Sequence, residues 1–229
     1  MHNNLRQIRS YVLRGGRLTK GQRFAIDNYW CKHGIEFTQS EINLNHLFNR
    51  RSPKILDIGT GMGDTTANIA SNHPENDYLA VEVHRPGIGN LLNQIELKKL
   101  SNIKIIEHDI MDVLQHQLPR YCLDAVYIFF PDPWPKKRHH KRRLINLKFL
   151  DVLQGKLKSH AIIFLATDWE DYAQHILDVF EKNPVFINLA GKHNAAPRPY
   201  WRPVTRFEQR GIKLQHDVQN FAFCLARNY

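Results

Sequence analysis

Carboxylates lie at or just beyond the ends of three short apolar runs in this chain, namely Asp57, Glu82 and Asp109. If the runs are parallel strands, their carboxyl ends meet at one edge of a sheet and the three acids face one crevice. An acid-rich crevice suits a cationic sulfonium with an ammonium tail better than it suits a pyrophosphate. The pattern therefore favours S-adenosylmethionine over NAD as the ligand.

A glycine-rich segment follows the first of these runs. Residues 57–64 read Asp-Ile-Gly-Thr-Gly-Met-Gly-Asp, which places Gly59 and Gly61 where a strand would pass into a helix. Such a turn lets a ligand lie against the backbone, near the N–H groups of a helix N-terminus. Alone it fits a dinucleotide, a methyl donor or a plain tight turn. With the acids, it predicts that Glu82 accepts hydrogen bonds from ribose hydroxyls and Asp109 from an adenine amino group, although each acid taken singly could cap a helix or turn.

The most specific segment is Phe-Phe-Pro-Asp-Pro-Trp at 129–134, which ends another apolar run. Pro131 and Pro133 fix φ and favour extended geometry in their neighbours, so the carboxylate of Asp132 is held in place. Trp134 offers a flat face on which a base could stack, a contact worth roughly 1–3 kcal/mol. A rigid surface turn with a packed tryptophan is the alternative, and the position at a strand end disfavours it.

Basic residues are concentrated in three stretches of a chain whose formal net charge is +10. The stretches are 1–25, 136–143 and 198–213. A single run of this kind would be ordinary solvated surface. Three runs beside these motifs predict a surface that binds a polyanion, because each neutralised phosphate releases counterions.

Two further polar clusters stay ambiguous at this level. Asp168 follows the run 161–166, where it could face the same edge of the sheet or cap a helix that starts at Trp169. Thr205 and Glu208 could contact a substrate or form no more than a capping box.

Alternating strand and helix patterns must position these groups. In the segment 86–100, Ile88, Leu91, Leu92 and Ile95 share one face, as a helix packed on a sheet requires. Strand and helix in alternation predict an α/β fold with a Rossmann-like, doubly wound, mostly parallel sheet. The expected strands are 54–58, 78–83, 103–107, 123–130, 161–166, 186–189 and 218–226, and the expected helices are 65–71, 86–100, 144–157 and 169–181.

The division of the chain follows from the same patterns. Residues 1–50 lack a strand-like apolar run and are expected to form a basic arm and a short helical region, whereas 51–229 hold the α/β domain, with one globular domain overall. No apolar run approaches the roughly 18 residues of a membrane span, and the start of the chain is polar and basic, so a cytoplasmic protein without a membrane partner is expected. The three cysteines lack the spacing of a disulfide framework or a zinc site, so no metal is expected. The oligomeric state stays open, with a monomer as the favoured interpretation.

In order and over nearly the whole chain, the motifs resemble those of the bacterial tRNA (guanine-N7-)-methyltransferases, a family of class I S-adenosylmethionine-dependent enzymes. The glycine-rich turn is generic to class I methyltransferases, whereas the Phe-Phe-Pro-Asp-Pro-Trp and Thr-x-Phe-Glu segments are more specific. The chain departs from the family at Asp57, where the family commonly has glutamate. The segments that carry the resemblance are 9–12, 17–19, 58–63, 81–84, 129–134, 136–143, 166–170 and 202–208.

The resemblance implies a seven-stranded methyltransferase fold and methylation of N7 of guanine 46 in the tRNA variable loop. Asp132 would be the catalytic residue. A fixed carboxylate there could hydrogen-bond the N1–H and amino group of guanine, orient N7 toward the methyl group and stabilise the positive charge that develops on the ring. The remaining assignments are cofactor-binding residues Asp57, Gly59, Gly61, Glu82, Asp109 and Asp132, substrate-binding residues Lys136, Asp168, Thr205, Arg206, Phe207 and Glu208, and RNA-binding residues Arg138, His139, His140, Lys141, Arg142 and Arg143.

Three rival functions remain open at this stage. A methyltransferase acting on adenine N6 or elsewhere on nucleic acid would label adenine rather than guanine. A noncatalytic RNA-binding protein on a methyltransferase-like fold would bind tRNA without S-adenosylmethionine. An NAD dehydrogenase is the weakest rival, because nothing in the sequence resembles a site for hydride transfer.

Overall fold

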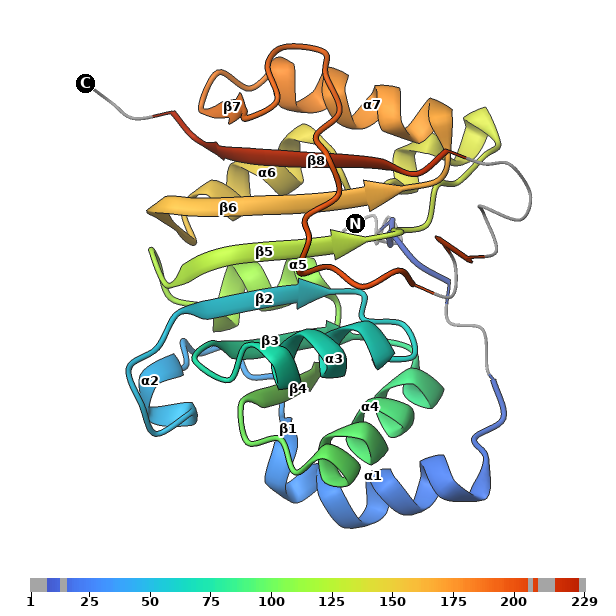
Figure 1. Cartoon of the computed structure of the whole chain (residues 1–229), viewed down its shortest axis with the longest axis vertical. Coiled ribbons are helices and arrows are strands. Elements are labelled where there is room, and N and C mark those ends of the chain that lie inside the picture. Colours follow the sequence, from blue (N-terminus) through green and yellow to red (C-terminus); the bar gives the residue numbers. More distant parts are fainter. Residues whose placement is uncertain (1–7, 13–15, 206–207, 210–216, 227–229) are drawn as a thin grey trace, which may run out of the picture.

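A computed structural model describes residues 8–12, 16–205, 208–209 and 217–226 of the chain (Figure 1). Its centre is an eight-stranded sheet in the order β1-β4-β3-β2-β5-β6-β8-β7. The pairs from β1 through to β6 are parallel, and β8 pairs antiparallel with both β6 and β7. The strands are β1 (Gly34–Ile35), β2 (Lys54–Ile58), β3 (Asp77–Glu82), β4 (Ile103–Glu107), β5 (Leu123–Phe129), β6 (Leu157–Thr167), β7 (Phe186–Asn188) and β8 (Gln219–Leu225).

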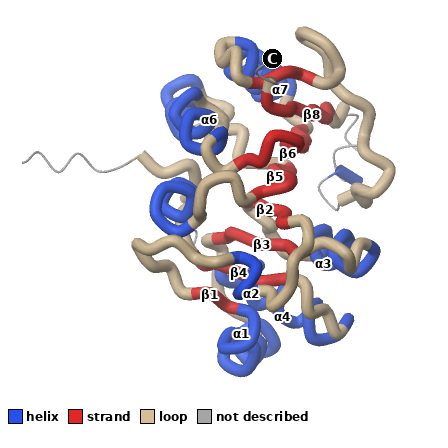
Figure 2. Tube along the Cα trace, turned by 90° about the vertical axis from the view of Figure 1, so that its left-hand side faces the viewer, coloured by secondary structure: helices blue, strands red, loops and turns tan. Residues whose placement is uncertain are grey.

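Helices cover both faces of the sheet, as a mostly parallel sheet requires. Figure 2 shows the sheet edge-on, with α6 on one side and α3 and α4 on the other. The two faces have separate apolar cores, and the four predicted contact residues of α4 are all 0% exposed in one of them. The helices are α1 (Lys20–His33), α2 (Leu44–Leu47), α3 (Asp64–Asn72), α4 (Arg85–Lys98), α5 (Ile110–Asp112), α6 (Leu147–Gln154) and α7 (Glu170–Glu181), with a π-helix, η1 (Val113–Gln117), and a 3-10 helix, η2 (Lys137–Arg142).

The predicted doubly wound α/β fold is confirmed, with one addition at the edge of the sheet. The two-residue strand β1 pairs with β4, so the sheet has eight strands where seven were expected. The helix α1 precedes it and packs against α4. The capping box of Thr19 and Gln22 fixes the start of α1, because each side chain accepts a hydrogen bond from the backbone of the other residue.

On part of one face of the sheet, the connection between β7 and β8 takes the place of a covering helix. Residues 190–205, which we call the strap, cross in front of β8, β6 and β5 (Figure 1). Ala196 forms a bridge with Asn220 of β8. Farther along the strap, the ring of Trp201 stacks on Tyr127 of β5 at a centroid distance of 4.8 Å and meets Phe164 of β6 edge-on at 5.0 Å. The strap thus covers apolar sheet surface that helices leave open.

The strand order reverses between β2 and β5, because the chain runs from β2 outward to β4 and then returns to the other side of β2. Loops that follow the carboxyl ends of β2 and β5 diverge at such a point and leave a crevice for a ligand. Among the described residues, no helix is both long and apolar enough to cross a membrane.

Candidate active site at the carboxyl edge of the sheet

The glycine-rich turn between β2 and α3 is left-handed at three positions. The φ angles of Gly59, Gly61 and Gly63 are 73°, 57° and 76°, values that side chains with a Cβ rarely adopt. An added Cβ at Gly63 would lie 2.5 Å from Cβ of Leu91, whereas at Gly59 or Gly61 it would meet no atom within 4 Å. The turn is therefore packed against α4 on one side and open on the other, where a ligand can reach the backbone.

A second glycine brings α4 against this turn. At Gly87 an added Cβ would lie 1.9 Å from the carbonyl oxygen of Gly61. Only a residue without a side chain allows the helix to approach so closely. The position of the turn is therefore fixed by α4 as well as by β2.

Glu82 at the end of β3 holds the same turn from the sheet. Its Oε2 accepts a hydrogen bond from the backbone N–H of Gly61 at 2.7 Å, and its Oε1 accepts from the N–H groups of Val83 and His84 at 2.7 and 2.9 Å. A carboxylate has about four lone-pair positions, so about one remains, on the oxygen nearer the turn. The residue is 7% exposed, and its hydrogen bonding to ribose hydroxyls stays a prediction.

Asp109 caps α5 and is paired with the amino-terminal part of the chain. One of its oxygens accepts from the N–H of Met111 at 2.8 Å, and the other lies 2.6 Å from Nη1 of Arg9. The same guanidinium nitrogen is 2.9 Å from Asp112. Asp109, the residue predicted to bind an adenine amino group, is therefore already paired with Arg9. The sequence did not indicate this cation as its partner.

Asp57 is turned toward α3. It is 3% exposed, and its Oδ2 accepts a hydrogen bond from the hydroxyl of Thr66 at 2.6 Å. Burial raises the pKa of Asp57 to about 7; the hydrogen bond from Thr66 opposes that rise and the nearby Glu82 carboxylate adds to it. Asp57 is thus positioned under the glycine-rich turn, and its part in cofactor binding stays a prediction.

The loop after β5 carries Asp132 in an exposed position on a constrained backbone. Phe130 and Trp134, on either side of it, have φ angles of 55° and 48°. The guanidinium of Arg143 donates to the carbonyl oxygen of Pro133 at 2.9 Å. A non-glycine residue with positive φ needs support from its surroundings. Arg143 supplies part of that support and keeps the loop in place.

The aromatic face of Trp134 is already in use. The guanidinium of Arg142 lies 5.0 Å from the ring centre, within the range of a cation–π contact, and Nε1 donates to the carbonyl oxygen of Ser10 at 3.0 Å. Ser10 is next to Arg9, so the short segment 8–12 connects Asp109 with the loop of Asp132. A base that stacks on Trp134 would have to share this ring with Arg142.

The basic segment after that loop forms η2, whose first flanking residue is Lys136. Of the predicted RNA-binding residues, Arg138 and Lys141 are exposed, and His139, His140 and Arg142 are partly exposed. Arg143 differs, because it is 2% exposed, pairs with Asp171 and lies over the ring of Tyr172 at 5.0 Å. Partial desolvation together with Arg138 and Arg142 lowers the pKa of His139, so this histidine adds little charge at neutral pH.

Asp168 does not cap the helix that follows it. The N-cap of α7 is Trp169, whose backbone N–H is bonded to the hydroxyl of Thr167 at 3.2 Å. The half-buried Asp168 lies beyond the carboxyl end of β6, on the same edge of the sheet as the other acids. The capping alternative is therefore wrong for Asp168, and its predicted contact with substrate stays a prediction.

Thr205 and Glu208 form the capping box that was the alternative to a substrate contact. The hydroxyl of Thr205 accepts from the N–H of Glu208 at 3.0 Å, and a carboxylate oxygen of Glu208 accepts from the N–H of Thr205 at 3.3 Å. Glu208 also binds Arg202, which is 0% exposed, with N–O distances of 2.7 and 3.0 Å. The other two residues of this group, Arg206 and Phe207, lie outside the described residues.

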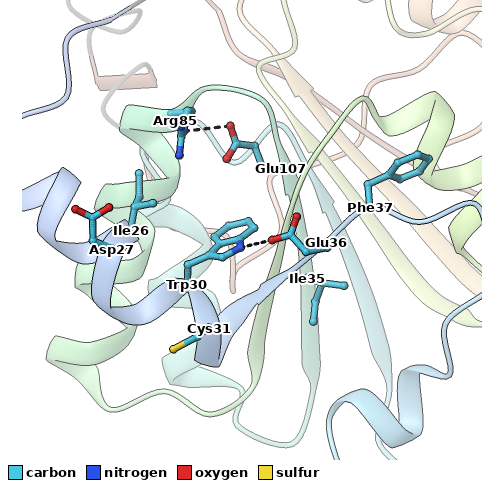
Figure 3. Close-up of a pocket in the computed structure, with 9 residues that line it drawn as sticks. All are labelled: Ile26, Asp27, Trp30, Cys31, Ile35, Glu36, Phe37, Arg85 and Glu107. Atoms are coloured by element: carbon cyan, nitrogen blue, oxygen red, sulfur yellow. Dashed lines mark hydrogen bonds and ion pairs between the residues drawn. The ribbon is translucent and has the colours of Figure 1, made fainter.

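A pocket beside the crevice lies between α1 and the end of β4 (Figure 3). Two pairs lie within its lining. Trp30 donates to Glu36 at 2.6 Å, and Arg85 lies 3.3 Å from Glu107. None of the residues that line the pocket is among the site residues predicted from the sequence.

Sequence reasoning missed Arg9, Thr66 and Arg202 as parts of this site. Arg9 and Thr66 bind acids that it did identify. Arg202 binds Glu208, six residues away and outside any regular element. No spacing rule links such partners; charge complementarity could have suggested the two arginine–carboxylate pairs, but nothing in the sequence indicates the pair of Thr66 and Asp57.

In sequence and in fold, the chain is similar to known methyltransferases. Residues 51–221 match a family described as putative methyltransferase. The tRNA (guanine-N(7)-)-methyltransferase of Nitrosospira multiformis is 54% identical over 97% of this chain and 96% of its own length, and that of Nitrosomonas eutropha is 51% identical over 96% and 97%. Among solved structures, the 16S rRNA methyltransferase KamB has a TM-score of 0.58 at 12% identity, covering 80% of this chain and 92% of its own, which is a likeness of fold alone.

Proposed function

Because the chain belongs to the tRNA (guanine-N7-)-methyltransferase family, we propose that it transfers a methyl group from S-adenosylmethionine to N7 of guanine 46 in the variable loop of tRNA. The observation that carries this proposal is the loop of Asp132. It follows β5 at the strand-order reversal, next to the glycine-rich turn, and the basic helix η2 follows it directly. This arrangement would bring a methyl donor and a polyanion beside one fixed carboxylate.

The residues at this edge fit a sulfonium cofactor. Gly59 and Gly61 leave open the space that a Cβ would fill, and Glu82 keeps about one free acceptor position beside the turn. Asp109 would accept a hydrogen bond from the adenine amino group in addition to its existing pair with Arg9. When bound, S-adenosylmethionine would supply an electrophilic methyl group next to a positive sulfur.

Asp132 would orient the base rather than remove a proton. N7 of guanine has a free lone pair and loses no proton when it is methylated, so a general base is not required. Positive charge develops on the ring, and a carboxylate bonded to N1–H and the amino group stabilises it as it forms. Arg143 and the flanking prolines keep Asp132 in position, which limits the reorganisation needed during the reaction.

Methyl transfer to two tRNA transcripts tests this proposal. The first transcript has guanine at position 46, and the second has adenine there. We expect label from S-adenosylmethionine on the first and none on the second, with 7-methylguanosine recovered after digestion. Label on adenine would support a different methyltransferase activity, and tRNA binding without any label would support a noncatalytic role.

A further inference from the structure

Tyr200 is the most exposed large apolar side chain among the described residues, at 93%. It lies in the strap within the turn 199–202, which is closed by a hydrogen bond of 3.0 Å from the N–H of Arg202 to the carbonyl oxygen of Pro199. Isolated exposed apolar residues are common on protein surfaces. Tyr200 is unusual because the next two residues, Trp201 and Arg202, make extensive contacts with the rest of the fold.

Trp201 and Arg202 make this turn rigid. Trp201 packs on Tyr127 and Phe164 of the sheet. The guanidinium of Arg202 is fully buried, where it is bonded to Glu208 and, at 3.0 Å, to Asn220. Since Pro199 fixes φ on the other side, the backbone at Tyr200 is held from both directions.

The surroundings of Tyr200 favour a polyanion. Residues 190–205 contain no aspartate or glutamate, and their exposed cations are Lys192 and Arg198, because Arg202 is buried and paired with Glu208. The guanidinium of Arg198 reaches the carbonyl oxygen of Arg202 at 3.3 Å, so a cation lies on the turn itself. An exposed aromatic ring beside a cation is an arrangement that stacks nucleobases and contacts their phosphates.

The turn is also close to the loop of Asp132. The guanidinium of Arg202 lies 5.5 Å from the ring centre of Phe129 and 5.8 Å from that of Phe130, the residues that precede Pro131 and Asp132. Two residues of extended chain span at most about 7 Å, so the backbone of Tyr200 lies within that distance of the backbone of Arg202. The turn of Tyr200 and the loop of Asp132 are thus joined through the side chain of Arg202, and RNA that extends from Asp132 over this contact would reach the turn.

We propose that Tyr200 is a stacking platform for an unpaired base of the RNA substrate, held in place by Trp201 and Arg202. This inference rests on the proposed function and adds a contact outside the catalytic loop. Because the backbone at Tyr200 is held and the side chain has only two χ angles, stacking of a base costs little conformational entropy, so the contact contributes mainly to affinity for RNA. The reaction at N7 itself would not depend on Tyr200.

Three substitutions test the platform: Tyr200→Ala, Tyr200→Leu and Tyr200→Phe. Removal of a stacking ring costs about 5- to 100-fold in affinity for nucleic acid, so we expect the tRNA Kd and KM of Tyr200→Ala to rise in this range with kcat unchanged. Tyr200→Phe keeps the flat ring and should behave like the wild type. Tyr200→Leu keeps apolar surface but no ring, and should resemble Tyr200→Ala.

Tyr121 provides the matched control, because it is 60% exposed and precedes β5 at the opposite, amino edge of the sheet. Tyr121→Ala should leave the tRNA Kd unchanged. The affinity of Tyr200→Ala for S-adenosylmethionine should also equal that of the wild type, which shows that the variant is folded.

The outcomes separate this inference from the proposed function. An unchanged tRNA Kd in Tyr200→Ala, in a wild-type background that methylates guanine 46, would overturn the platform alone. Wild-type affinity in Tyr200→Leu would also overturn it, since apolar contact without stacking would then suffice, as on a surface for a protein partner. If the wild type transfers no methyl group to tRNA, the proposed function fails instead.

Discussion

At the scale of single residues, the acids of the candidate site differ in how much of their bonding capacity is already used. Glu82 accepts three backbone hydrogen bonds, Asp109 is divided between a helix cap and Arg9, and Asp57 is enclosed with Thr66. These three acids are buried, whereas Asp132 is exposed. Buried acids thus hold the local backbone and side chains in place, and the acid with the proposed catalytic role is open to solvent.

Asp57 should make stability depend on pH. An aspartate of the unfolded chain ionises near pH 4, whereas burial raises the pKa of Asp57 to about 7 in the folded protein. Between pH 4 and pH 7, Asp57 keeps its proton in the folded protein and loses it in the unfolded chain. The free energy of unfolding therefore decreases as the pH rises from 4 to 7. The variant Asp57→Asn cannot ionise at this position. The difference between its thermal midpoint and that of the wild type should therefore increase by at least about 2–4 °C between pH 4 and pH 7.

Thermal unfolding from pH 4 to pH 8 measures that gain. Glu41→Gln, which removes an exposed carboxylate, provides the baseline. A constant difference between Asp57→Asn and the wild type over the whole range would show that Asp57 ionises normally in the folded state.

Substitution of Asp132 should separate catalysis from binding. Asp132→Asn keeps the size of the side chain and removes the charge that would stabilise the methylated base. We expect kcat for methyl transfer to fall by about 100-fold or more, with the tRNA Kd within a few-fold of the wild type. Single-turnover transfer and tRNA binding, measured on the same preparation, check this expectation, and a kcat equal to that of the wild type would remove Asp132 from its assigned role.

At the scale of elements, the contact between α4 and the glycine-rich turn sets the shape of the cofactor crevice. The helix can approach because Gly87 has no side chain, and the turn can lie there because its glycines adopt positive φ. The sequence predicted the turn from its glycines but not the role of Gly87. A glycine near the start of a helix has no local signal for what it will contact in the fold.

Gly87→Ala should therefore disturb both stability and cofactor binding. Its Cβ would overlap the carbonyl group of Gly61, so either α4 or the turn must move, at a cost of about 1–3 kcal/mol. Gly21→Ala is the matched control, since this glycine is also near a helix start and an added Cβ would meet no atom within 4 Å. Thermal unfolding and calorimetry with S-adenosylmethionine should show losses for Gly87→Ala only; equal affinity in the two variants would contradict the role of the contact.

At the scale of the whole molecule, the sequence was informative wherever burial produces a repeated pattern. The strands β2 to β6 and the helices α3 and α4 bury continuous runs or one face, and these patterns appear directly in the sequence. The strand β1 has only two residues, too few for any periodicity, and it was missed. Partners such as Arg9 and Asp109 are 100 residues apart, so only the closed fold brings them together. The division at residue 50 stays a prediction.

Binding of RNA also depends on the folded molecule, because the fold decides which basic residues after the loop of Asp132 are exposed and which are buried. Arg138 and Lys141 of η2 are exposed beside the loop of Asp132, whereas Arg143 is buried and supports that loop. The double variant Arg138→Gln with Lys141→Gln should therefore weaken tRNA binding without disturbing the fold. For each phosphate that the variant no longer neutralises, the slope of log affinity against log salt should decrease in magnitude by roughly 0.7 to 0.9.

A charge-matched control tests whether position matters and not only net charge. Arg51 and Arg120 are exposed and precede β2 and β5 at the amino edge of the sheet. Arg51→Gln with Arg120→Gln removes the same total charge, and its salt slope should equal that of the wild type. If both double variants flatten the slope equally, tRNA is attracted by the overall charge of +10 and η2 has no special place in the interface. A change confined to the η2 variant would place the phosphates of the substrate next to Asp132.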